Sequence, residues 1–167
     1  MKKELDDALC TTYPLIFKDR HADMRSTLMC WGFEVGDGWY DLLDSTCALI
    51  YWPYKQACQS YERARLMEGT LPYVGAHLVT AVSVERARLK MVEVAQKIPV
   101  AVQVKEKYGT LRFSVNGGTV QAASYINFAE FHSGKVCEKC GAPGEIRNSG
   151  WVRVLCDTHH EEREPKG

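Results

Sequence analysis

The sequence predicts an α+β protein with a mainly helical N-terminal part, one β-hairpin and a small cysteine-rich module at the C-terminus. Three observations support this fold class. Apolar residues recur at helical spacing through much of the N-terminal part. Valines then alternate with polar residues in two short runs joined by a glycine-containing turn. Near the end, two closely spaced pairs of metal-ligand residues follow one another.

Two short elements are expected before the first long helix. A helix over 2–10 should end before Pro14, because the residue preceding a proline disfavours the helical conformation. Residues 29–35 are expected to be extended. The glycine-rich stretch 36–38 predicts a turn, and Asp37 is well placed to cap the helix that follows.

The long helical region should be divided by its prolines. Helical spacing of apolar residues predicts a helix over 39–52, and Pro53 should interrupt it. A second helix is expected over 54–67, followed by a loop over 69–82. Ser83 would then cap a helix over 84–97.

The strongest strand signal lies in the middle of the chain. Alternation over 100–105 and again over 111–115, with a turn at 107–109, predicts a β-hairpin. Thr119 should cap a helix over 120–132.

The last quarter of the chain carries a four-ligand pattern. Cys137 and Cys140 form one pair, and after fifteen further residues Cys156 and His159 form the second. Two such turns can direct three sulfurs and one nitrogen to a single centre, which suits tetrahedral Zn²⁺. The spacing favours His159 over the neighbouring His160 as the fourth ligand.

The order of elements around these ligands is that of a treble-clef or zinc-ribbon-like module. A knuckle with Gly141 is followed by a strand over 151–155 and a short helix over 158–164. The predicted domains are therefore a main domain at 1–134, a zinc-binding module at 135–164 and a tail at 165–167.

Four protein ligands leave no open coordination position, so the predicted zinc is structural. A catalytic zinc would need an exchangeable ligand, and a redox cysteine pair would need a surrounding βαβ pattern. Treble clefts also occur in His-Asn-His nucleases, but the Asp-His pair that usually precedes the hairpin is missing here.

Composition limits the classes of function. The chain has 167 residues, and its 21 Lys and Arg balance its 21 Asp and Glu, which argues against wholesale nucleic-acid binding. It has no run of eighteen apolar residues, and its charged first residues are not followed by an apolar stretch. We therefore expect no membrane span, no signal peptide and a cytoplasmic location. Four cysteines outside the metal pattern are expected to be buried thiols: Cys10, Cys30, Cys47 and Cys58.

Two further groups of residues are candidate sites. Lys105, Lys107, Tyr108 and Arg112 surround the hairpin turn and predict a basic aromatic surface for phosphate or an acidic protein. The alternative is a solubilising strand edge that blocks unwanted pairing. Trp151 and Arg153, on the strand of the module, could pack the module on the main domain or touch a partner, and packing is the favoured interpretation.

Asp37, Asp41 and Asp44 form the second candidate group, because they fall at helical spacing. They could hold a divalent cation or act as an acid–base pair, although a helix cap with a solvated face explains the same pattern.

Several motifs together resemble a group of small proteins found in bacteriophages and prophages. They are Gly-Asp-Gly-Trp at 36–39, Lys-Glu-Lys-Tyr-Gly-Thr-Leu-Arg-Phe at 105–113, Cys-Glu-Lys-Cys-Gly-Ala-Pro-Gly at 137–144 and Leu-Cys-Asp-Thr-His at 155–159. The resemblance implies a zinc-binding tail and a phage or prophage origin, and it implies no particular activity.

Phage accessory proteins often bind and block host factors, including immune systems. The first hypothesis is therefore a non-enzymatic binding protein in the host cytoplasm, with a host protein as partner, the basic hairpin as the leading contact and a counter-defence role. Nucleic-acid binding through the hairpin and the module is the first alternative. A hydrolase that acts on nucleotides or nucleic acid through the 37–44 region is the second.

Overall fold

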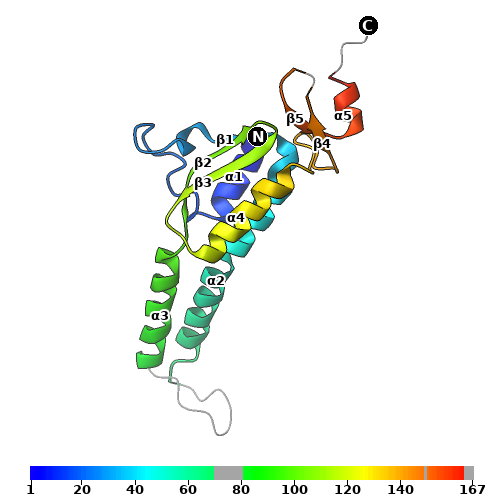
Figure 1. Cartoon of the computed structure of the whole chain (residues 1–167). Helices are drawn as coiled ribbons and strands as arrows, with labels where there is room; N and C mark the ends of the chain where they lie inside the picture. The colour runs from blue at the N-terminus through cyan, green and yellow to red at the C-terminus, as the bar shows by residue number, and fades with distance from the viewer. Residues whose placement is uncertain (70–80, 149, 164–167) are drawn as a thin grey trace.

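The structure is a computed structural model of the chain, and it describes residues 1–69, 81–148 and 150–163. Its central element is a three-stranded sheet in the order β1–β2–β3. The short strand β1 (Phe33–Glu34) is parallel to β2 (Val100–Lys107), and β2 is antiparallel to β3 (Thr110–Asn116). Helices pack around this sheet, so the α+β prediction is confirmed (Figure 1).

The helices near the sheet are α1 (Lys3–Thr12), the first half of α2 (Tyr40–Leu66) and α4 (Val120–Ser133). The core that they enclose with the sheet consists of large apolar side chains that solvent does not reach. Its largest members are Trp39, Leu9, Ile16, Met29, Leu43, Leu111 and Val104.

Helix α4 covers the outer edge of β3. The Ser133 hydroxyl accepts a hydrogen bond from the Leu111 N–H at 2.8 Å, and the Glu130 carboxylate accepts one from the Phe113 N–H at 2.8 Å. These side chains satisfy backbone donors that an unpaired edge strand would otherwise expose. The predicted cap of α4 is confirmed, since the Thr119 hydroxyl accepts the Ala122 N–H at 3.1 Å.

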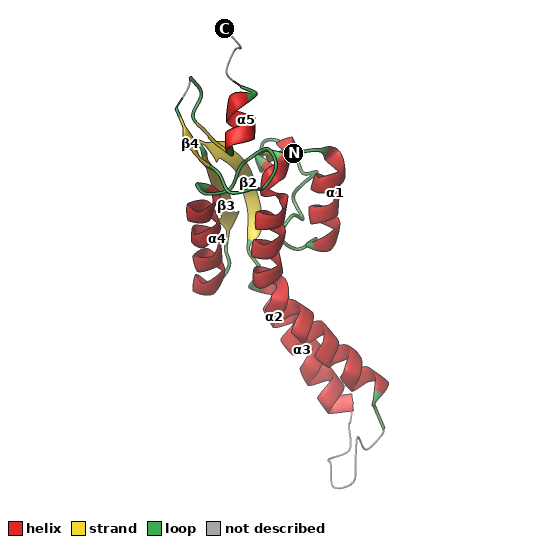
Figure 2. Cartoon of the chain, turned by 90° about the vertical axis from the view of Figure 1, so that its right-hand side faces the viewer, coloured by secondary structure: helices red, strands yellow, loops and turns green. Residues whose placement is uncertain are grey.

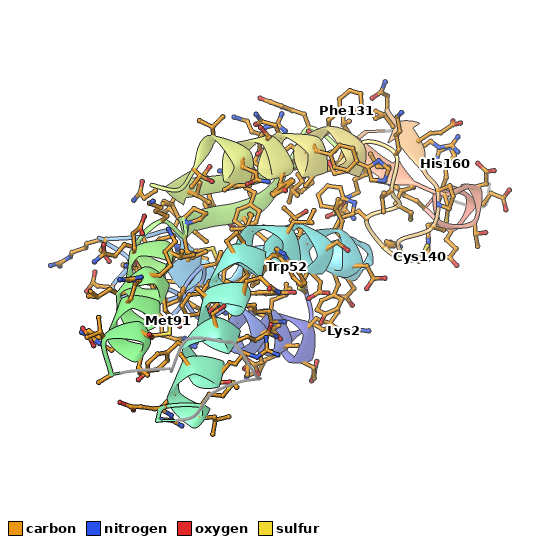
Figure 3. All side chains as sticks on the ribbon, turned by 90° about the horizontal axis from the view of Figure 1, so that it is seen from below. Lys2, Trp52, Met91, Phe131, Cys140 and His160 are labelled. Atoms are coloured by element: carbon orange, nitrogen blue, oxygen red, sulfur yellow. The ribbon has the colours of Figure 1, made fainter. Side chains whose placement is uncertain are left out.

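The second half of α2 runs beside α3 (Ala81–Gln96) and away from the sheet, and the two form a projecting arm (Figures 1 and 2). Figure 3 shows this arm with Trp52 on α2 and Met91 on α3. None of the residues of α3 is fully buried, so the arm contributes little to the core.

The predicted break at Pro53 is wrong, because α2 continues through it from Tyr40 to Leu66. Pro53 removes the hydrogen bond to the Leu49 carbonyl, but Leu49 is 51% exposed, so water can reach this side of the helix. Packing of the two halves of α2 on α4 and α3 maintains the helix, and Figure 2 shows it changing direction midway.

Other local predictions need correction. Only Phe33–Glu34 of the expected 29–35 strand is extended, because Met29–Trp31 forms a 3₁₀ helix (η1) and Gly32 then turns the chain with φ of 79°. Ser83 lies inside α3 instead of capping it. The loop expected over 69–82 falls mainly on residues outside the described ranges.

Asp37 does not cap the long helix. It begins a second 3₁₀ helix, η2 (Asp37–Trp39), whose N-cap is Gly36. Its carboxylate instead accepts the backbone N–H of Lys2 at 2.7 Å and pairs with the Lys2 ammonium at 3.3 Å. Asp37 therefore holds the N-terminus of α1.

The C-terminal module, called the finger here and comprising residues 135–163, lies at the end of the molecule opposite the tip of the arm (Figure 1). Strand β4 (Glu145–Arg147) is antiparallel to β5 (Arg153–Leu155), and α5 (Asp157–Glu161) follows. The hairpin and helix are as predicted, although strand and helix are each shorter than expected.

Among the four cysteines outside the metal pattern, Cys47 is buried and the other three are half-buried. No helix in the described part of the chain combines the length and apolar character needed to cross a bilayer.

Candidate metal centre

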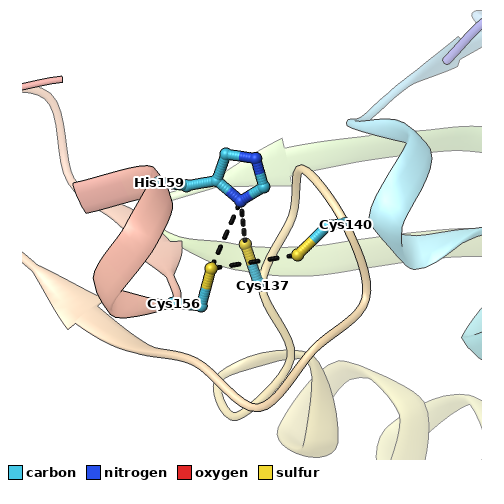
Figure 4. A group of neighbouring side chains, drawn as sticks. All are labelled: Cys137, Cys140, Cys156 and His159. Carbon is cyan, nitrogen blue, oxygen red and sulfur yellow. Dashed lines mark hydrogen bonds between the residues drawn. The ribbon is translucent and has the colours of Figure 1, made fainter. Parts of the chain in front are cut away.

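Four side chains of the finger converge on one point (Figure 4). The Sγ atoms of Cys137, Cys140 and Cys156 and a ring nitrogen of His159 all lie within 4.8 Å of one another. The His159 Nδ1 atom is 3.5 Å from Cys137 Sγ and 3.2 Å from Cys156 Sγ, and the Sγ atoms of Cys140 and Cys156 are 3.8 Å apart.

These distances can be compared with those of a tetrahedral site. Metal–sulfur bonds of about 2.3 Å and metal–nitrogen bonds of about 2.0 Å place the sulfurs about 3.8 Å apart and sulfur about 3.5 Å from nitrogen. The cluster therefore has dimensions that fit a tetrahedrally bound metal ion. Within the described residues it is the one group of three or more ligand-type side chains this close together, and it contains His159 instead of His160.

The knuckle positions the first two ligands. The Cys137 N–H donates to the Ala142 carbonyl at 2.7 Å, and the Gly141 N–H donates back to the Cys137 carbonyl at 2.8 Å. Gly141 has φ of 79°, a left-handed conformation that only glycine adopts at little cost. The sequence-based prediction of a tight knuckle at this residue is confirmed.

Helix α5 positions the other two ligands. Cys156 is its N-cap, and His159 lies three residues further on, within the helix. The second ring nitrogen of His159, Nε2, is 3.8 Å from the Glu162 carboxylate. A carboxylate on the outer nitrogen of a ligating imidazole commonly orients the ring and increases its basicity.

The electrostatic environment differs between the cysteines. Burial acts to raise the pKa of Cys137, but hydrogen bonds from the backbone N–H groups of Cys156, Cys140 and Lys139 outweigh it and lower the pKa to about 6. At Cys140 the Ala142 N–H lowers the pKa, yet burial and the neighbouring thiols raise it overall. Three such close sulfurs can all ionise readily only around a cation.

The finger docks on the turn before α2, which was expected to be a plain turn. The backbone N–H groups of Gly38 and Gly36 donate to Glu138, the first to its carbonyl at 2.9 Å and the second to its carboxylate at 3.0 Å. The Trp39 indole N–H donates to the Val136 carbonyl at 2.8 Å. These bonds fix the knuckle against the buried start of α2.

Only glycine fits at positions 36 and 38 of this turn, because a side chain at either would clash with backbone atoms of the finger. A Cβ atom at Gly38 would lie 2.3 Å from the Cys137 carbonyl oxygen and 2.5 Å from the Cys140 nitrogen. A Cβ atom at Gly36 would lie 2.2 Å from the Glu138 carbonyl oxygen. The motif of two glycines followed by a tryptophan is visible in the sequence. Its contact with Glu138 could not be predicted, because that residue lies about a hundred positions away in the chain.

The structure brings together three of the four predicted hairpin residues. Lys105, Lys107 and Tyr108 line a groove of about 460 Å³ between the hairpin turn and the finger, together with Trp151. We call this surface, which also includes Glu106, Gly150 and Val152, the hairpin–finger groove.

Arg112 is the fourth predicted residue, and it lines a different hollow. It lies opposite Lys105 in the strand ladder, but it faces a depression beside Phe131 of α4. Trp151 was expected to pack the finger on the main domain, yet it is 67% exposed. Its indole N–H nevertheless donates to the Glu106 carboxylate of β2 at 3.3 Å, so Trp151 touches the main domain, while the bonds to the turn before α2 come from Val136 and Glu138.

The three aspartates of the second candidate site are not brought together. Asp37 binds Lys2, and the Asp44 carboxylate accepts the Tyr13 hydroxyl at 2.8 Å. Asp41 is exposed. The three aspartates therefore do not form a shared cation site. Of the alternative interpretation, the solvated face agrees with the exposed Asp41, but no side chain of the described residues caps α2.

Fold and site together define a small α+β protein with a C-terminal centre of three cysteines and one histidine that can bind a metal ion. Comparisons with models of protein families, with curated proteins and with solved structures each found no match.

Proposed function

We propose that the chain is a zinc-stabilised binding protein without catalytic activity of its own. The four-ligand cluster carries this proposal, since three thiolates and one imidazole in a tetrahedral arrangement suit Zn²⁺ and suit Mg²⁺ or Ca²⁺ poorly. With four protein ligands, the ion has no open position for water or substrate. Its role is therefore to fold and position the finger.

The need for such an ion follows from the small size of the finger. Its buried residues are few, principally Cys137, Val154 and Leu155. A segment with so little core requires a metal or another cross-link to fold. The ion would hold the knuckle against Gly38 and so hold the β4–β5 loop beside the hairpin turn.

The contact surface in this proposal is the hairpin–finger groove. Tyr108 and Trp151 are 75% and 67% exposed, and Lys107 is exposed beside them. Exposed aromatic rings with flanking cations are a common feature of macromolecular contact sites.

The resemblance to phage and prophage proteins supports a host protein as the partner, with a counter-defence role in the host cytoplasm. Nucleic acid is the second candidate partner, and the two exposed rings beside Lys105 and Lys107 favour it.

Two measurements test this function. Elemental analysis of purified protein should find one zinc per chain. Affinity capture from host lysate, with and without nuclease, should recover a partner that is lost in Lys107→Glu and retained in Lys55→Glu. Lys55 is an exposed residue of α2, which makes it a matched control. Absence of zinc, or equal capture by both variants, would refute the proposal.

A further inference from the structure

Tyr108 occupies a backbone position that a bulky residue rarely adopts. It has φ of 54° and is followed by Gly109 with φ of 80°, so both central residues of the two-residue hairpin turn are left-handed. Such turns favour Asn, Asp or Gly at the first position. A tyrosine there is strained, and its ring is 75% exposed, so packing within the chain does not compensate. The ring is therefore best explained by a contact outside the chain.

Trp151 is presented in a comparable way from the finger. It follows Gly150, which has φ of 78°, in the loop between β4 and β5. Its indole N–H donates to the Glu106 carboxylate at 3.3 Å. The other oxygen of the same carboxylate accepts the Gly109 N–H at 2.6 Å. Glu106 thus ties the turn that carries Tyr108 to the indole of Trp151.

The charges around these rings indicate the chemistry of the ligand. Lys105 and Lys107 line the same groove, and the Lys107 ammonium lies 5.4 Å from the centre of the Tyr108 ring. The acidic residue of the groove, Glu106, uses both carboxylate oxygens in the bonds just described. Two ammonium groups disfavour a cationic side chain between the rings and favour an aromatic group that carries an anion.

We propose that the hairpin–finger groove binds single-stranded nucleic acid. Bases would stack on Tyr108 and Trp151, while Lys105 and Lys107 contact the phosphates. Duplex bases are already stacked on each other, so their faces are not available to such rings, whereas every unpaired base offers one. This inference rests on the proposed function, because it uses the same groove and develops the second candidate partner, nucleic acid.

The expected salt dependence of binding and the expected losses of affinity are modest. Two phosphate contacts predict a slope of about −1.4 for the logarithm of the binding constant against the logarithm of the salt concentration. Removing one stacking ring should weaken binding by about 5- to 150-fold. The balanced net charge of the chain adds no long-range attraction.

The test uses full-length, zinc-loaded protein and short oligo(dT), oligo(U), a DNA duplex and UMP as probes. Quenching of tryptophan fluorescence reports stacking, and anisotropy of end-labelled oligomers reports affinity. The variants are Tyr108→Gly, Trp151→Ala and, as a control, Trp52→Ala. Trp52 is 59% exposed on α2, away from Cys140 and His160 of the finger (Figure 3).

Tyr108→Gly is the most informative variant, because it relieves the backbone strain. It should leave the fold as stable as before or more stable, and still lose binding of the single strands. Trp151→Ala should lose both affinity and most of the quenching, and Trp52→Ala should retain binding. Preserved stability separates loss of a contact from loss of the fold.

Several results would overturn the inference. These are no binding of oligo(dT) or oligo(U) at low salt, equal or tighter binding of the duplex, equal affinity for UMP, or unchanged binding in Tyr108→Gly. If oligonucleotides fail to bind while Lys107→Glu still abolishes capture of a host protein, the proposed function stands and this inference falls.

Discussion

Replacement of Gly38 by alanine tests how the finger is attached. Gly38 does not have a positive φ, so the substitution adds no backbone strain, and its effect comes from contact alone. The new Cβ atom would lie 2.3 Å from the Cys137 carbonyl oxygen, 2.4 Å from the Gly141 nitrogen and 2.5 Å from the Cys140 nitrogen. All three are backbone atoms of the knuckle, so no side-chain rotation can relieve the clash.

The knuckle must therefore move away by about 1 Å to restore ordinary contact distances. Overpacking of this kind costs about 1–3 kcal/mol, and weakening of the Gly38 N–H bond to Glu138 adds about 1 kcal/mol. We expect a total loss of about 2–4 kcal/mol in the free energy of unfolding. Folding of so small a module is generally coupled to metal binding, so part of this loss should appear as weaker metal affinity.

Urea unfolding and chelator competition measure the two effects. Gly134→Ala is the control, since Gly134 also lies outside the left-handed region and its nearest neighbouring atom would be 3.5 Å from a Cβ. This control should be neutral or slightly stabilising. If Gly38→Ala retains both the stability and the metal affinity of the wild type, the docking geometry described above is wrong.

Three further predictions concern metal, pH and the sheet edge. Complete metal removal should abolish amide protection over 135–163 and leave protection of the sheet largely intact, as hydrogen exchange can show. Burial acts to raise the pKa of Asp6, but the hydrogen bond from Arg20 at 2.7 Å and the charge of Arg20 outweigh it, so the pKa is lowered overall. The stabilisation by this ion pair is therefore present above pH about 4 and is lost as pH falls further. Asp6→Asn should cost about 2–3 kcal/mol at pH 7, less than a fully buried pair because the Arg20 side chain is 20% exposed, and should flatten the acid limb in pH-dependent urea unfolding. Glu130→Ala leaves the Phe113 N–H without its acceptor, and urea unfolding should show a loss of about 1–3 kcal/mol.

Elements with local signals could be predicted from the sequence. Thr119 supplies its own cap, and the hairpin carries both strand alternation and a short turn. Pro53 misled the prediction because its local effect is overridden by packing of α2 on two other helices. The predicted capping role of Asp37 is wrong because its carboxylate binds Lys2 at the N-terminus of α1, 35 residues away in the chain.

The candidate site divides in the same way. Ligand spacing within each turn is local, so Cys137, Cys140, Cys156 and His159 were predictable. The acceptors in Glu138 for the two glycine N–H groups depend on tertiary structure, and periodicity gives no signal for them. The predicted domain boundary near residue 134 remains a prediction.

The two rings of the groove belong to parts of the chain that meet only through the docked finger. The turn that carries Tyr108 is local to the hairpin, and Glu106 stabilises it without any help from the finger. Trp151 reaches the groove only if β5 is held beside the knuckle, where the Glu138 N–H donates to the Val154 carbonyl at 3.0 Å. Metal loss should therefore remove one side of the groove and leave the other in place. A structural ion would then control binding while lying outside the contact surface, because it determines where Trp151 lies.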